Sequence, residues 1–250
     1  MIDRRTSVRR ALRQRQRGFI INPFRFGGGG GGSDPDFASV SSLLHLDGTD
    51  GSTTFTDVKG KIWTGAGNAQ IDTAQSKFGG ASLLLDGTGD YINTPNHASL
   101  NFGTGDATVE LFARTAVTTG TSILICKHQS ATGSWIVFRN GTSLLLYVSS
   151  TGSGWDIANG ISIGTIAAST WYHVAWVRDG TTFRTFLDGV PGSTATSSSS
   201  IYAGTQPLTL GGNPGAGDYF NGHLDEVRVT TGVARYTSAF SPPIAAFPNS

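Results

Sequence analysis

The chain has 250 residues, of which 35 are glycine, while 14% are charged and cysteine and methionine occur once each. A single cysteine excludes a disulfide framework within the chain, and no stretch approaches the roughly 18 apolar residues of a membrane-spanning helix. The net charge of +1 is distributed unevenly along the chain. Residues 1–26 carry eight arginines and one acid, or +7, whereas the remaining ten basic and sixteen acidic residues give −6.

The first 26 residues are interpreted as a basic anchoring arm. Clustered arginine suits nucleic-acid phosphates or an acidic protein surface, and a solvated tail is the plainer alternative. Large apolar side chains in FIINPFRF favour a groove on a protein partner. The residues expected to make the contacts are Arg4, Arg5, Arg9, Arg10, Arg13, Arg15, Arg17, Phe19, Phe24, Arg25 and Phe26.

Residues 27–36 begin with six consecutive glycines followed by Ser-Asp-Pro-Asp, a composition typical of a linker. The globular domain is therefore expected to span residues 37–250. From residue 40 onward the sequence consists of short apolar or alternating runs separated by Asp-Gly, Asn-Gly and Gly-rich turns. About a dozen strands with such turns predict an all-β, two-sheet antiparallel jelly-roll sandwich with an extended N-terminal arm.

Residues 171–189, WYHVAWVRDGTTFRTFLDG, carry the strongest strand signal. Asp-Gly at 179–180 predicts a hairpin, and both faces of the first run are largely apolar, which indicates an interior strand covered on both sides. Asn-Gly at 140–141 predicts a further hairpin with a type I′ turn. In residues 106–116, Ala107, Val109, Leu111 and Ala113 are expected to face inward, and Thr108, Glu110, Phe112 and Arg114 outward.

These segments together resemble LamG-like (concanavalin A-like) jelly-roll domains. The similarity lies in WYHVAWVRDG followed by FLDG, in GGASLLLDGTGDYIN, in GDATVELFAR and in the ending LTLGGN…YFNGHLDEVRV. The segment VARYTSAFSPP resembles the tail of LamG-like domains in bacteriophage virion proteins and bacterial surface proteins, and VSSLLHLDG resembles a strand near the start of the phage versions. The resemblance implies a capsid or tail component at the virion surface, oligomeric within an assembly. It does not fix an activity, because this architecture serves lectins, hydrolases and scaffolds alike.

No catalytic residue is predicted. Glycoside hydrolysis needs two carboxylates roughly 5–9.5 Å apart, but the chain has only two glutamates. One of them, Glu226, follows Asp225, and adjacent strand residues point to opposite faces. Cys126 and His128 share a face of one apolar run, where an inert buried thiol is the simpler interpretation. His173 is expected to be a hydrogen-bonded core histidine.

The resemblance also implies one structural Ca²⁺, which related sandwiches hold with an aspartate of the last strand and oxygens of the first strands. Asp225 matches that aspartate, and Asp47 and the Gly87 carbonyl are the nearest early candidates. The alternative is that aspartates preceding glycine simply form turns.

Glycan binding would use exposed aromatic rings beside polar groups. Trp155, Asp156 and Asn159 in the Gly-rich segment GSGWDIANG are the first candidates, and Tyr202 and Tyr219 the second; core packing is the alternative. The sequence thus predicts a non-enzymatic phage decoration protein with capsid or tail partners and a possible host-surface glycan. A free bacterial carbohydrate-binding module or glycan-active enzyme is one alternative, and an arm that contacts the packaged genome is the other.

Overall fold

The computed structural model of the protein describes residues 33–214 and 217–250. Within these residues the strands form two antiparallel sheets. The eight-stranded sheet contains β13 (Val190–Thr196), β12 (Thr182–Leu187), β11 (Tyr172–Asp179), β6 (Ala107–Thr115), β15 (Asn221–Thr231), β4 (Ser82–Asp86) and β3 (Gln70–Asp72) in that order, with β1 (Val40–Leu44) paired to β15. The seven-stranded sheet contains β10 (Ala158–Thr165), β9 (Ser143–Val148), β8 (Thr132–Asn140), β7 (Thr121–Gln129), β14 (Leu208–Leu210), β5 (Tyr91–Thr94) and β2 (Thr64–Ala66). Two 3₁₀ turns, η1 (Phe37–Ser39) and η2 (Ala98–Leu100), complete the elements of the described chain.

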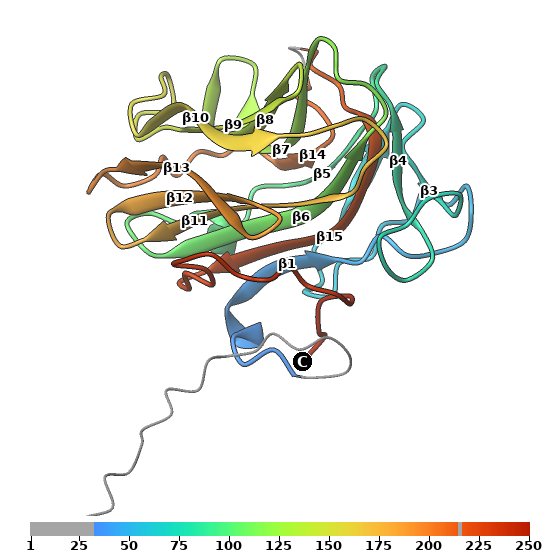
Figure 1. Ribbon diagram of the computed structural model, residues 1–250, viewed down its shortest axis with the longest axis horizontal. Coiled ribbons are helices and arrows are strands. Elements are labelled where there is room, and N and C mark those ends of the chain that lie inside the picture. Colours follow the sequence, from blue (N-terminus) through green and yellow to red (C-terminus); the bar gives the residue numbers. More distant parts are fainter. Residues whose placement is uncertain (1–32, 215–216) are drawn as a thin grey trace, which may run out of the picture.

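The two sheets stack face to face, with the seven-stranded sheet above the eight-stranded sheet in the view of Figure 1. Their inner faces share one apolar core, in which Trp135 of β8 packs against Trp176 of β11 at a ring-centroid distance of 5.3 Å. This is the predicted all-β jelly-roll sandwich, and the prediction is confirmed. Short Gly-rich turns suit such a fold because they let many brief strands reverse direction.

Strand β11 has the interior position that its sequence predicts. It pairs with β6 on one side and β12 on the other. Val174 and Trp176 enter the shared core, while Ala175 and Val177 pack into a second apolar cluster on the outer face of the same sheet. The predicted hairpin after β11 also forms, because Asp179 pairs with Thr182.

The hairpin between β8 and β9 forms as well, but its turn differs from the predicted type I′. Asn140 pairs with Ser143, so Gly141 and Thr142 are the central residues. Gly141 has a positive φ of 60°, whereas the φ of Thr142 is not positive. A positive φ at the first central residue only is the type II′ pattern, which glycine at that position permits.

The inner positions of β6 are confirmed, since Ala107, Val109, Leu111 and Ala113 all lie in the shared core. The outer positions are not left to solvent. Phe112 and Glu110 are each at most 1% exposed, because segments from both ends of the described chain cover this face. Phe247 packs on Phe112. The rings of Tyr236 and Phe240 stack on each other at a centroid distance of 3.6 Å and pack against Phe186.

The start and end of the described chain lie together on this covered side. The Asp34 amide donates a hydrogen bond to the Ser250 carbonyl oxygen at 2.6 Å. Figure 1 places this junction below β1 and β15, on the opposite side of the sandwich from β8, β9 and β10. Asp34, which the sequence analysis assigns to the predicted linker of residues 27–36, is buried against the domain.

Candidate functional site

Half-buried aromatic side chains gather on the outer face of the seven-stranded sheet. Trp155, in the loop between β9 and β10, lies 5.6 Å from the ring of Tyr147 on β9 and 5.5 Å from His128 on β7. Phe138 on β8 meets Tyr147 edge to face at 6.0 Å. Phe138, Tyr147 and Trp155 cover the small apolar cluster of Ile123, Cys126 and Ile136 and remain partly exposed, whereas His128 is buried. We call Phe138, Tyr147, Trp155 and His128 the aromatic row.

The loop that carries Trp155 is held by its own polar groups. The Ser150 amide and hydroxyl donate to the two carboxylate oxygens of Asp156 at 2.8 and 2.5 Å, and these bonds lower the pKa of Asp156. The Gly152 amide donates to the Ser149 hydroxyl, and the Gly152 carbonyl accepts from the Gly133 amide. Asp156 therefore orders the loop, and its carboxylate stays exposed beside Trp155.

Tyr202 and Asn159 border the same loop. The Tyr202 amide donates to the Ser149 carbonyl at 2.9 Å. Its ring lies on Gly152, where a Cβ would come within 2.5 Å of the ring and where φ is +82°. Only glycine suits both conditions, so Tyr202 packs against the loop. Asn159 is exposed on β10 and pairs with Tyr147.

Tyr219 lies farther along the same sheet and stacks on Tyr91 of β5 at 6.5 Å. Its ring also contacts Gly212, whose neighbour Asn213 bonds to His128 at 2.9 Å through side chains. The predicted candidates thus fall into two groups, Trp155 with Asp156, Asn159 and Tyr202, and Tyr219 with Tyr91, joined through the Gly212–Asn213 segment.

Sequence reasoning missed Tyr147, Phe138 and His128. In SLLLYV the tyrosine occupies the face opposite Leu144, Leu146 and Val148, which are fully buried. That alternation is a usable signal, because an aromatic residue on the non-core face of a strand has no shared core to fill. The contacts of Tyr147 and His128 with Trp155 depend on the path of the loop, which the alternation does not reveal.

The predicted calcium ligands are only partly brought together. One oxygen of Asp225 accepts from the Lys77 and Phe78 amides at 2.7 and 3.1 Å. The Asp47 carboxylate lies against Gly79, the next residue of that turn. Gly87 lies at the opposite end of β4, beside Asn221.

Asp225 itself suits a cation. Its Oδ1 atom is buried with no hydrogen-bond partner in residues 33–214 and 217–250, and burial raises its pKa to about 7. A bound Ca²⁺, which prefers hard oxygen ligands, would compensate that buried carboxylate. Within the same residues, no group of three or more His, Cys, Asp or Glu side chains is arranged to hold a metal ion.

The prediction that Asp225 and Glu226 point to opposite faces is wrong. A β-bulge lies between Asp225 and Arg228 of β15, and Glu226 adopts φ of 48°. A bulge adds one residue to the strand and breaks the alternation. Both carboxylates therefore reach the covered outer face, where Glu226 accepts from the Phe247 amide and bonds to His45 at 2.8 Å each.

A buried charged network occupies the centre of that covered face. Glu110 bonds to Arg228 at 2.8 Å, to His173 at 3.1 Å and to the Tyr236 hydroxyl at 2.8 Å. Asp34 pairs with Arg228 at 3.1 Å and with a second guanidinium, that of Arg235. We call these six residues the covered-face network. His173 is thus the hydrogen-bonded core histidine that was expected, and both glutamates of the chain are engaged by internal contacts.

Cys126 is fully buried, and burial raises its pKa to about 12. The thiol is therefore protonated at neutral pH and inert, as expected. The eleven arm residues from Arg4 to Phe26 lie outside the described residues, so the anchoring prediction stays a prediction.

Comparison with known proteins agrees with this architecture. The chain aligns with the binding domain of Paraclostridial Mosquitocidal Protein 1 with a TM-score of 0.64 and 12% identity, covering 80% of this chain and 50% of that one. It aligns with domain 4 of AbnA, an extracellular arabinanase from Geobacillus stearothermophilus in complex with arabinotriose (TM-score 0.52, 19% identity, 78% and 94% covered). The receptor-binding domain of botulinum neurotoxin D gives 0.58 and 10% identity, with 79% and 50% covered.

The chain spans about half the length of the two toxin domains. No curated protein sequence matches it. No helix among the described residues is long and apolar enough to cross a membrane.

A two-sheet sandwich with an open aromatic face defines a lectin-like β-sandwich domain. Residues 86–235 match the Laminin_G_3 family, described as the concanavalin A-like lectin/glucanases superfamily, and the chain belongs to that family.

Proposed function

We propose that the domain binds a glycan on the outer face of the seven-stranded sheet, centred on Trp155. The observation that carries the proposal is the aromatic row beside exposed Asp156 and Asn159. Aromatic faces stack on the C–H face of a sugar ring, while carboxylate and amide groups bond its hydroxyls. Arabinotriose in the complex of the AbnA domain supports a saccharide as the ligand class.

We further propose that the domain is displayed on a bacteriophage particle as a non-enzymatic decoration or adhesion module. In this proposal residues 1–26 dock into a capsid or tail protein. The described chain begins on the side of the sandwich opposite the aromatic row, an arrangement that would let the domain be anchored from one side and bind from the other. The phage origin itself rests on the resemblance of the sequence segments.

Glycan-array binding by the full chain, with arabinotriose among the probes, tests the ligand proposal. Trp155→Ala should abolish binding while the protein keeps a cooperative thermal transition. Trp171→Ala is the matched control, because Trp171 is also half-buried but lies on the other sheet's outer cluster. Binding that survives in Trp155→Ala, or that is lost equally in both variants, would contradict the proposed site.

Deleting residues 1–32 tests the anchoring proposal. The truncated chain should fold and should no longer join its particle, as measured by co-sedimentation with assembled virions. Retained incorporation would overturn it. Binding of a synthetic 1–26 peptide to DNA that weakens steeply with salt would favour the genome-contact alternative.

A free carbohydrate-binding module is the second candidate function, favoured by the 94% coverage of the AbnA domain. It predicts the same loss of binding in Trp155→Ala but no partner for the arm. The glycan-active enzyme alternative has less support, since both glutamates bond to internal partners.

A further inference from the structure

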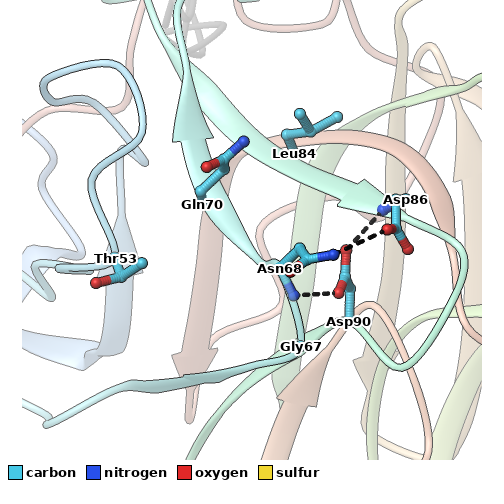
Figure 2. A pocket seen from close by; sticks show the side chains of 7 residues that line it. All are labelled: Thr53, Gly67, Asn68, Gln70, Leu84, Asp86 and Asp90. Atoms are coloured by element: carbon cyan, nitrogen blue, oxygen red, sulfur yellow. Dashed lines mark hydrogen bonds between the residues drawn. The ribbon is translucent and has the colours of Figure 1, made fainter.

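A concave site separate from the aromatic row lies at the opposite end of the sandwich from the loop of Trp155. It is a cavity of about 490 Å³, within the size range of small-molecule sites of roughly 300–1,000 Å³. Its walls come from β3, β4, the turn before β3, the turn after β4, and the loop between β1 and β2 (Figure 2). The lining residues are Thr53, Gly67, Asn68, Gln70, Leu84, Asp86 and Asp90.

Asp90 fixes the geometry of this cavity. One of its oxygens accepts from the Asn68 amide at 2.5 Å, and the other accepts from the Asp86 amide at 2.8 Å (Figure 2). Gly67 makes room for this contact, because a Cβ there would lie 2.2 Å from the Asp90 carboxylate. With both oxygens occupied and only 1% of the residue exposed, Asp90 positions its neighbours and leaves ligand contacts to them.

Asp90 holds the backbone of two residues, Asn68 and Asp86, whose side chains are exposed. Asp86 accepts from the Thr88 amide at 2.7 Å and from the Asn68 side-chain amide at 3.4 Å. A carboxylate offers about four acceptor positions and an amide side chain offers both donors and acceptors. Asp86 and Asn68, which both line the cavity, therefore keep further donor and acceptor positions for a ligand.

Gln70 and Thr53 supply the remaining polar groups. No hydrogen bond joins either side chain to another part of the chain that the structure describes. Their backbone is nevertheless fixed, because residues on both sides of the cavity pair: the Gly51 amide donates to the Ile71 carbonyl and the Ile71 amide to the Ser52 carbonyl, each at 2.8 Å. Leu84, half-buried on β4, adds one apolar side chain.

The composition of the lining selects the ligand class. It contains no Lys, Arg or His, and Asp86 and Asp90 give it acidic character, so phosphates, sulfates and nucleic acids are disfavoured by charge. One leucine is too little apolar surface for a lipid or drug-like ligand. What fits is a compact neutral molecule with several hydroxyls and a modest apolar face.

We propose that this cavity binds one neutral sugar residue, with Gln70, Asn68, Asp86 and Thr53 bonding its hydroxyls and Leu84 contacting its C–H face. This goes beyond the proposed function, because the site is independent of the aromatic row. Affinity in the millimolar range is expected, since every bond formed replaces a bond to water.

Amide chemical-shift mapping on the full chain tests the proposal, with D-galactose, D-glucose, D-mannose and L-arabinose as probes. At least one sugar should cause saturable shifts at Asn68, Gln70 and Thr88. Gln70→Ala should weaken that binding at least tenfold, and Asp86→Asn should weaken it as well. Gln129→Ala, which removes an exposed glutamine of β7, is the matched control and should leave the dissociation constant unchanged.

The outcome is separable from that of the aromatic row. Trp155→Ala should leave the shifts at Asn68 and Gln70 intact. Sugar-induced shifts confined to the loop of Trp155 would overturn the cavity proposal and leave the proposed function standing. Shifts at the cavity caused by Ca²⁺ and by none of the sugars would also overturn it, as would equal binding by wild type and Gln70→Ala.

Discussion

The two outer faces of the sandwich are built by the same strand alternation but meet different surroundings. On the eight-stranded sheet, segments from both ends of the described chain cover the outer face, and Glu110, Phe112 and His173 are at most 1% exposed. On the seven-stranded sheet, Phe138, Tyr147 and Trp155 remain half-exposed. One face therefore holds both ends of the described chain, and the other keeps aromatic rings partly exposed. The difference arises from what the chain places over each sheet, since both strand sets alternate.

The covered face depends on a charged network, so its disruption should give the largest effect. Glu110→Gln keeps the side-chain shape but leaves Arg228 buried with one fewer carboxylate. Breaking a buried ion pair in this way typically costs about 3–5 kcal/mol. We expect a loss of that order in the free energy of unfolding, measured by urea denaturation.

Asp179→Asn provides the control on a solvent-accessible pair. Asp179 and Arg184 form a 3.2 Å ion pair with side chains 36% and 30% exposed, and such pairs contribute below about 1 kcal/mol. Equal losses in the two variants would mean that the network does not hold the covered face.

Asp34 tests whether the start of the described chain belongs to that face. Burial would raise its pKa, but hydrogen bonds from Arg235 and the Asp36 amide, with the charges of Arg235 and Arg228, hold the pKa below its usual 3.8. A depressed carboxyl pKa stabilises the fold above 3.8, and this stabilisation is lost as pH falls through the folded-state pKa.

Asp34→Asn should accordingly cost about 1.5–3 kcal/mol at pH 7, the range for hydrogen bonds to charged groups. The difference from wild type should shrink progressively below pH 4. Urea midpoints across that pH range measure it, and a difference that does not change with pH would show that the ion pairs contribute nothing.

The sequence predicted the inner, core-facing residues of the strands better than the environment of the outward-facing ones. Alternation in β6 and β11 placed Val109, Leu111 and Trp176 correctly, because the shared core requires apolar residues at every second position. It could not predict that Phe112 and Glu110 are buried, since the covering residues such as Phe247 are more than 100 positions away in the chain.

The candidate site shows the same limit. Trp155 was chosen as a candidate from its Gly-rich loop, but its contacts with Tyr147 and His128 depend on the strand order and on the path of the loop, which the sequence does not state. The bulge at Glu226 was missed because no residue type in this segment indicates one. Glutamate rarely adopts the left-handed backbone conformation found there. The prediction from strand alternation therefore failed at the bulge of β15, where Asp225 and Glu226 lie on the same side of the sheet.

Calcium addition is expected to give the smallest effect and to act on the covered face. Asp225 is buried there, burial raises its pKa to about 7, and one of its oxygens has no hydrogen-bond partner among the described residues. A bound ion would stabilise the folded state by about 1.4 kcal/mol at a Ca²⁺ concentration ten times the dissociation constant. The melting temperature should rise on adding Ca²⁺ at pH 8 and rise less at pH 5.5, where a proton competes for the carboxylate.

Asp225→Asn separates the ion from the cost of burying the charge. Without Ca²⁺ this variant should be more stable than wild type above pH 7, because a raised carboxyl pKa means that ionisation disfavours the fold there. With Ca²⁺ it should show no stabilisation, whereas Asp156→Asn, on the open face, should respond as wild type does. A calcium response that persists in Asp225→Asn and disappears in Asp156→Asn would place the ion on the wrong face and would reverse the assignment of the two surfaces.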